Sequence, residues 1–120
     1  MRRLMVAGNW KMNTLRESAV ALARTVVAGT IAATEHVDVL VAPPFPYLIP
    51  VVEAVSGSRV MVGAQNAYHQ QPGAFTGEVG LEMLVDVGCT SVILGHSERR
   101  HILGETDAAI NAKVRVALQK

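Results

Sequence analysis

The sequence is poor in cysteine and in aromatic residues. Cys89 is the single cysteine among 120 residues, so no internal disulfide can form, and a reducing, cytoplasmic compartment is the simplest expectation. Aromatic residues make up 4% of the chain, whereas half of it is apolar. We therefore expect a core of Val, Ala, Leu, Ile and Met, a composition that suits parallel strands covered by helices.

The sequence also lacks an excess of either charge, because it has 11 basic and 10 acidic residues and a net charge of +1. This balance gives no electrostatic basis for binding nucleic acid or an anionic membrane. The apolar run behind the basic start ends at Gly8, too short for a signal-peptide core, and no stretch approaches a membrane span.

Several common site patterns are missing. His96 and His101 are five positions apart, or roughly 140° around a helix, so they share no ligand face. With one cysteine and scattered histidines there is no zinc pattern. Glycine-rich nucleotide motifs and a Gly-x-Ser-x-Gly elbow are absent as well. We expect neither a metal nor a cofactor.

What the sequence does contain is a regular alternation of strand-like and helix-like segments, without a linker or a low-complexity break. Thr14 and Thr106 are candidate N-caps of the first and last helices. Four βα units of about thirty residues each predict one α/β domain over residues 1–120, with a parallel sheet and right-handed crossovers. The expected strands are 4–9, 37–42, 60–64 and 92–94, and the expected helices are 15–28, 47–55, 81–87 and 107–119.

The string Gly-His-Ser-Glu-Arg-Arg at 95–100 is the most informative part of the chain. It places His96 at the carboxyl end of the fourth strand, with Ser97 as a plausible N-cap for the next turn of helix. Backbone N–H groups and the positive end of a helix disfavour imidazolium. We therefore expect a neutral His96 ring at neutral pH, which can polarise a carbonyl group.

A second string, Gly-Asn-Trp-Lys-Met-Asn at 8–13, lies at the exit of the first strand. If extended geometry continues for two residues, Asn9 and Lys11 point the same way. The lysine supplies positive charge for a phosphate dianion and for a developing oxyanion, and the asparagine supplies an amide donor. Taken alone, an Asn-x-Lys pair is more often a solvated turn.

Together these strings resemble the triosephosphate isomerase family, and the resemblance covers the whole chain. Residues 103–107 also resemble the family, with Leu103 where Phe is common. The resemblance implies a (β/α)8 TIM barrel, which has eight βα units and roughly 250 residues. This sequence therefore corresponds to the N-terminal half of a barrel, with four units.

The family also implies an activity, the interconversion of glyceraldehyde 3-phosphate and dihydroxyacetone phosphate in glycolysis and gluconeogenesis. Asn9 and Lys11 would then contact the phosphorylated triose, and Lys11 and His96 would be catalytic. Glu98 would lie beside the lysine, either as a catalytic group or as an ion-pair partner. The neutral histidine of this family is itself a well-known example of pKa tuning.

The segment Gln71-Pro72-Gly73-Ala74-Phe75-Thr76-Gly77-Glu78 reads most simply as a solvated loop. In the family, however, this loop reaches into a second subunit of a dimer. The resemblance thus implies that Phe75, Thr76 and Glu78 lie at an interface. Gln65 and Asn66, at the exit of the third strand, are expected to support the site.

Half a barrel lacks parts that the family requires. The family's catalytic base is a glutamate after the sixth strand, and its phosphate loops follow the seventh and eighth, none of which we expect here. The first and fourth strands would have unpaired edges. Met5, Ala7 and the inward residues of strands two to four, with Val39 among them if it points inward, would face water. Three hypotheses follow: a chain completed by a separate C-terminal half, a self-associating inactive homo-oligomer, or a scaffold that binds phosphorylated ligands through Lys11.

Overall fold

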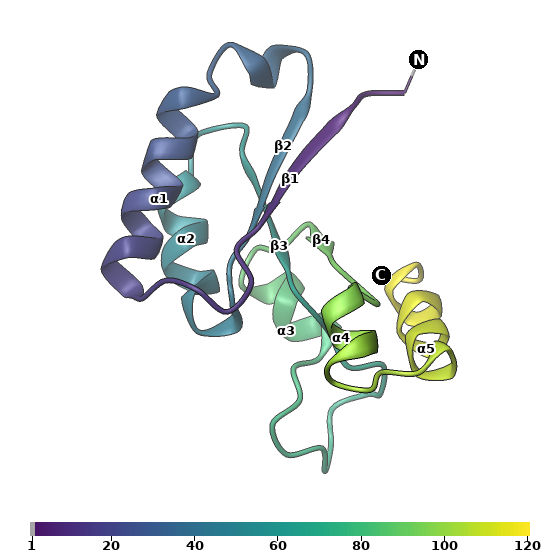
Figure 1. Cartoon of the computed structure of the whole chain (residues 1–120). Coiled ribbons are helices and arrows are strands. Elements are labelled where there is room, and N and C mark those ends of the chain that lie inside the picture. The colour runs from purple at the N-terminus through teal and green to yellow at the C-terminus, as the bar shows by residue number, and fades with distance from the viewer. Residues whose placement is uncertain (1) are drawn as a thin grey trace.

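A single parallel sheet organises the chain, of which the computed structural model describes residues 2–120. The strand order is β1-β2-β3-β4, so neighbours in sequence are also neighbours in space (Figure 1). The sheet with its alternating helices confirms the predicted α/β fold, half of a TIM barrel. The strands are β1 (Met5–Asn9), β2 (Asp38–Ala42), β3 (Met61–Ala64) and β4 (Ser91–Val92).

Helices follow each strand, as the sequence predicts. Figure 1 shows α1 and α2 side by side on one face of the sheet. The helices α3, α4 and α5 lie together at the lower right of the same picture. The fourth strand is shorter than predicted, although the Ile93 N–H still donates to the Ala64 carbonyl at 2.8 Å. The helices are α1 (Arg16–Gly29), α2 (Leu48–Val55), α3 (Leu81–Asp86), α4 (Ser97–His101) and α5 (Asp107–Ala117), with 3₁₀ turns η1 (Ala33–Glu35) and η2 (Phe45–Tyr47).

The core lies between the sheet and the α1–α2 pair. Ala19 and Ala23, one turn apart on α1, are fully buried and let that helix approach closely. Val39 packs in the same cluster. Val39 therefore faces the helices, and the expectation that it could point to the inner face is wrong.

The inner face is the opposite face of the sheet. Met5 and Ala7 are exposed on β1, as predicted, and Met5 keeps 53% of its surface accessible. Leu40, which pairs with Ala7 in the parallel register, is only 3% exposed. A Cβ on Gly63 would lie 3.1 Å from Leu40 Cδ2, so Leu40 rests over this glycine. The expectation that β2 exposes its inner side chains is therefore wrong for Leu40, whereas Met5 of β1 is exposed on this face.

Of the two threonines predicted as N-caps, Thr106 caps its helix and Thr14 does not. Thr106 caps α5 as expected, with its hydroxyl accepting the Ala109 N–H at 3.2 Å. Thr14 does not cap α1, because its φ is 81° and an N-cap needs an extended backbone. Leu15 takes that position instead, and its N–H donates to the Ser18 hydroxyl at 2.8 Å.

We predict that Gly88→Ala destabilises the chain more than Gly57→Ala does. Both glycines have positive φ, +103° and +82°, but only at Gly88 would a Cβ meet a side chain, 2.8 Å from Val52 Cγ1. The left-handed backbone should cost each variant about 1–2 kcal/mol, and the contact with α2 should add roughly 1–3 kcal/mol at Gly88. Urea unfolding of the two variants measures the difference, and equal losses would contradict this account of α3 packing on α2.

Candidate active site

A cavity of about 340 Å³ lies at the carboxyl ends of the strands. Ligands of parallel α/β sheets bind at this edge because the strand exits converge there. The cavity brings together all four residues predicted to bind substrate or to act in catalysis. Its lining consists of Asn9, Lys11, Met12, Pro44, Phe45, Pro46, Gln65, Asn66, His96, Glu98, Arg99 and Leu103.

Lys11 reaches this cavity from a left-handed backbone conformation, with φ at 58°. Its N–H donates to Asn9 Oδ1 at 2.9 Å, so the chain turns immediately after β1. The expectation that extended geometry would align Asn9 with Lys11 is therefore wrong, although both line the cavity. A left-handed backbone costs a non-glycine residue about 1–2 kcal/mol, so other contacts must hold Lys11 in place.

The side chain of Lys11 forms an ion pair with Glu98, whose Oε1 lies 2.7 Å from Lys11 Nζ. Both side chains are about half exposed. The hydrogen bond from Lys11 holds the pKa of Glu98 below its ordinary value, and this outweighs the upward effect of desolvation. The positive charge of Lys11 lowers the pKa further. Glu98 is therefore an ionised carboxylate that joins the exit of β1 to the first turn of α4.

His96 caps α4 with its own ring, since Nδ1 accepts the Glu98 N–H at 3.1 Å. The prediction of Ser97 as the N-cap is wrong by one residue. A ring nitrogen that accepts a hydrogen bond carries no proton, so this contact corresponds to a neutral imidazole with its proton on Nε2. Glu98 Oε2 lies 3.6 Å from Nδ1, and the same carboxylate is paired with Lys11.

A largely buried polar network includes two residues that line the cavity, Asn66 and Arg99. Glu105 Oε2 accepts hydrogen bonds from Lys113 Nζ at 2.7 Å and from Arg99 Nε at 3.0 Å, and Lys113 also donates to Asn66 Oδ1 at 3.0 Å. Desolvation pushes the pKa of Glu105 upward, but these two cations bring it below its ordinary value. The network ties α5 to β3 and to α4.

Sequence reasoning expected a supporting role for Asn66 but overlooked Lys113. Lys113 is only 6% exposed, and it lies three positions after the buried Ile110. A charged residue at that spacing falls on the apolar face of the helix. A lysine at an apolar position of the helix was the sequence feature that could have identified Lys113 as part of a buried network.

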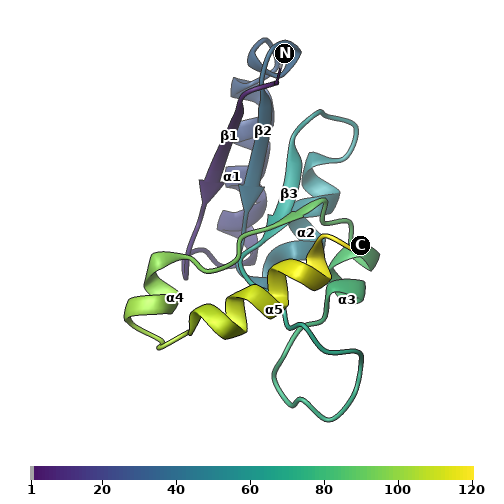
Figure 2. The same cartoon turned by 90° about the vertical axis from the view of Figure 1, so that its right-hand side faces the viewer.

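The predicted interface residues lie away from this cavity, on a loop that projects from the body of the chain (Figure 2). Thr76 and Glu78 are exposed. Phe75 is 39% exposed and packs on Tyr68, with ring centroids 4.9 Å apart. Phe75 therefore has an aromatic partner within its own chain.

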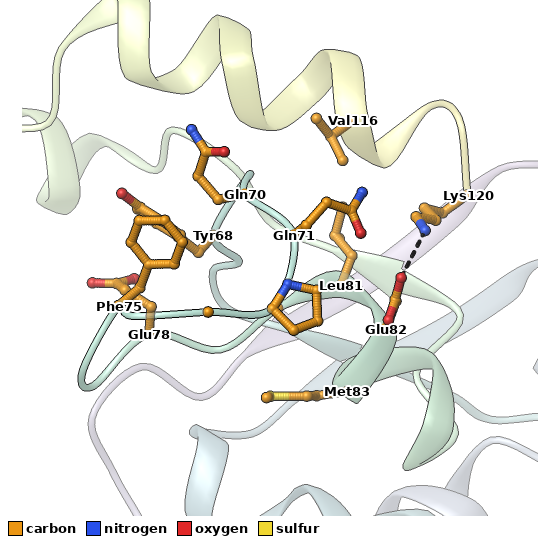
Figure 3. Close-up of a pocket in the computed structure, with 13 residues that line it drawn as sticks. Tyr68, Gln70, Gln71, Phe75, Glu78, Leu81, Glu82, Met83, Val116 and Lys120 are labelled. Carbon is orange, nitrogen blue, oxygen red and sulfur yellow. Dashed lines mark hydrogen bonds and ion pairs between the residues drawn. The ribbon is translucent and has the colours of Figure 1, made fainter.

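A separate cavity of about 100 Å³ lies between this loop, α3 and α5 (Figure 3). Phe75 and Leu81 contribute to its apolar lining, and an ion pair of 3.2 Å between Lys120 Nζ and Glu82 Oε1 lies at its rim. It shares no lining residue with the larger cavity. It contains none of the residues predicted for catalysis.

Two negative findings apply to residues 2–120. In that range no three His, Cys, Asp or Glu side chains gather closely enough to hold a metal ion. Over the same residues, no helix combines the length and the apolar character that crossing a membrane requires.

Parallel βα units with a lysine, a histidine and a glutamate at the strand exits define a TIM-barrel type of chain with its site at the carboxyl face. A family model described as triosephosphate isomerase matches residues 4–120, and the chain belongs to the triosephosphate isomerase family.

Individual relatives agree. The triosephosphate isomerase of Rhodopirellula baltica is 51% identical over 117 residues, which cover 98% of this chain and 46% of the relative. That of Carboxydothermus hydrogenoformans is 49% identical with the same two shares. That of Chlorobium phaeobacteroides is 46% identical over 120 residues, or 100% of this chain and 48% of the relative. The chain thus spans about half the length of the curated relatives it matches.

We predict that Glu105→Leu costs about 3–5 kcal/mol of unfolding free energy at neutral pH, because it leaves the Lys113 ammonium buried without a counter-charge. Adding Lys113→Met should recover most of the loss. Since the pKa of Glu105 is lowered in the folded chain, its contribution is present near neutral pH and disappears as pH falls below the ordinary glutamate range. Denaturant unfolding from acid to neutral pH measures both effects, and an additive double variant would contradict the coupling.

We also predict that Lys11→Met raises the pKa of Glu98 toward its ordinary value, because Lys11 provides the hydrogen bond and the charge that lower it. Carboxyl-carbon NMR shifts through an acid titration measure the pKa directly. Lys120→Met, which removes a lysine paired with Glu82 instead, serves as the control. An unchanged Glu98 titration in Lys11→Met would show that the ion pair is absent in solution.

Proposed function

We propose that this chain supplies the electrophilic half of a triosephosphate isomerase active site, which interconverts glyceraldehyde 3-phosphate and dihydroxyacetone phosphate. The observation that carries the proposal is the single cavity lined by Asn9, Lys11, His96 and Glu98. Membership of the family supports it. On this proposal the protein works in the cytoplasm on a small phosphorylated triose and uses no metal or cofactor.

Each residue has a role that fits its contacts. Lys11 presents a half-exposed ammonium for the phosphate dianion and for the negative charge that develops on the enediolate. The neutral His96 ring donates its Nε2 proton to the substrate oxygen. The Oδ1 of Asn9 accepts a hydrogen bond from the Lys11 N–H, so its Nδ2 group is the part that donates to substrate. Glu98 acts as the ion-pair partner that orients Lys11.

A base that removes the carbon-bound proton has to come from elsewhere. Glu98 is the one carboxylate lining the cavity among residues 2–120, and its lowered pKa and its pairing with Lys11 make it a poor base. We therefore propose that a C-terminal half-barrel supplies the base as a separate partner. The same partner would cover the exposed Met5 and Val6 on β1, which keep 53% and 60% of their surface accessible.

The loop carrying Phe75, Thr76 and Glu78 is proposed to contact a second subunit. Its exposure is compatible with that role. The sheet provides the stronger reason to associate, because apolar burial contributes roughly 25 cal/mol per Å² and β1 exposes more apolar surface than the loop tip. A chain without its complement is therefore expected to self-associate through the β1 edge or the inner face.

Mixing this chain with a purified C-terminal half-barrel and measuring isomerase activity tests the proposal. The chain alone should show no turnover above a Lys11→Ala control, and the mixture should be active. Lys11→Ala should lower the rate of the mixture by about 10²–10³-fold, the usual effect of removing one stabilising donor from a developing oxyanion.

Lys120→Ala, which removes a lysine outside the cavity, is the matched control and should leave the rate of the mixture unchanged. A high rate from the chain alone, abolished by Lys11→Ala, would refute the need for a second half. Binding of inorganic phosphate that depends on Lys11, without activity in the mixture, would favour a ligand-binding scaffold instead.

A further inference from the structure

We propose that the smaller cavity binds an aromatic α-amino acid with a single six-membered ring. The ring enters the cavity, and the ammonium and carboxylate groups of the ligand pair with Glu82 and Lys120 at the rim. The smaller cavity shares no lining residue with the larger one. The two sites are therefore independent, and isomerase activity measured without the amino acid does not depend on this cavity.

The volume of the cavity limits the size of the ligand. It is about 100 Å³, whereas an enclosed apolar cavity of about 150 Å³ in a protein interior binds benzene. One six-membered ring therefore occupies most of the space when its substituted end lies at the solvent-accessible rim. The fused rings of an indole exceed this volume, so the cavity favours a ligand with one ring.

The apolar part of the lining already contains an aromatic pair. The rings of Phe75 and Tyr68 have centroids 4.9 Å apart and an interplanar angle of 49°, and Phe75 is still 39% exposed. Leu81 from α3 and Val116 from α5 are half-buried and line the same cavity (Figure 3). A further ring among these side chains would remove apolar surface of three segments from water and add an aromatic contact. The interior therefore favours an aromatic ring.

The charges at the rim determine the polar end of the ligand. Lys120 Nζ and Glu82 Oε1 lie 3.2 Å apart, and their side chains are 35% and 56% exposed. An exposed pair of this kind contributes little to stability, so it opens at small cost. A zwitterion replaces it with two pairs, ammonium with Glu82 and carboxylate with Lys120. A ligand with a single charge would leave one of the two rim groups unpaired.

Glu78 also lines the cavity, but it is exposed and lies beside Phe75 and Tyr68, away from the pair of Lys120 and Glu82 (Figure 3). The ligand that matches both the interior and the rim is therefore a single-ring aromatic amino acid, for which L-phenylalanine is the probe.

The test titrates the isotope-labelled 120-residue chain with L-phenylalanine and follows the methyl NMR signals of Leu81 and Val116. We expect saturable shifts with a Kd on the order of 1 mM, typical of a small ligand that buries one ring. L-Alanine has the same charges without the ring, and it should bind at least about 10-fold more weakly because it buries far less apolar surface. Equal affinities for the two amino acids, or no saturable shift with L-phenylalanine, would overturn the proposal.

Two analogues with one charge each test the rim. Phenylpropanoate keeps the ring and the carboxylate, and phenylethylamine keeps the ring and the ammonium. Each should bind about 3–5-fold more weakly than L-phenylalanine, because it loses one exposed ion pair. Lys120→Met leaves Glu82 as the rim charge and should reverse the order, so that phenylethylamine binds more tightly than L-phenylalanine. Glu82→Gln should instead favour phenylpropanoate, and an unchanged order of affinities in either variant would overturn the proposal.

A cavity-filling variant tests the interior. Val116→Phe places a new ring in the cavity from α5 and should abolish the shift of the Leu81 methyl signals by L-phenylalanine. Val114→Phe is the matched control, because Val114 lies on the same helix, is 38% exposed and does not line the cavity. It should leave the Kd unchanged. Unchanged binding in Val116→Phe would place the ligand elsewhere and overturn the proposal, and if that variant does not fold, the order of affinities in Lys120→Met and Glu82→Gln decides.

Discussion

Parallel pairing of four consecutive strands is the constraint on which the site depends. Each strand of the sheet runs in the same direction, and the register pairs Asn9 with Ala42 at the last position of β1 and β2. All strand exits therefore meet at one edge, so that short loops bring Lys11 and His96 to a common cavity although one follows the first strand and the other the fourth. The cavity needs no long loop to bring these two residues together, because the sheet places the strand exits side by side.

The same pairing leaves the sheet with unpaired edges, and the strands differ in how much apolar surface they expose. β2 and β3 are covered on the outer face by α1 and α2, and on the inner face Leu40 is buried over Gly63. β1 has a neighbour on one side only and exposes Met5 and Val6. An unpaired, apolar edge strand invites pairing with another chain. This apolar edge is the physical basis for placing the proposed complementary half at β1.

The sequence predicts the order and type of the elements because apolar runs and helix-length segments alternate regularly. It also predicts which residues line the cavity, because Lys11 and His96 directly follow strands. Its errors concern single backbone conformations: Thr14 and Lys11 adopt positive φ without being glycine, and no propensity scale anticipates that. The side of the sheet on which Val39 lies depends on the register, and the hydrogen bond from Gln65 Nε2 to the Lys11 carbonyl links strand exits that meet only after folding.

The ion pair between Lys11 and Glu98 is compatible with the proposed binding of an anion in this cavity. Its two side chains are about half exposed, and exposed pairs of this kind contribute only about 0–1 kcal/mol. A phosphate dianion carries more charge than the carboxylate and can share the ammonium at little cost. The main chain of Lys11, by contrast, is fixed by hydrogen bonds that do not involve the charge. Position and electrostatics are therefore separated: neighbouring strands hold the residue, while its ammonium remains available to a ligand.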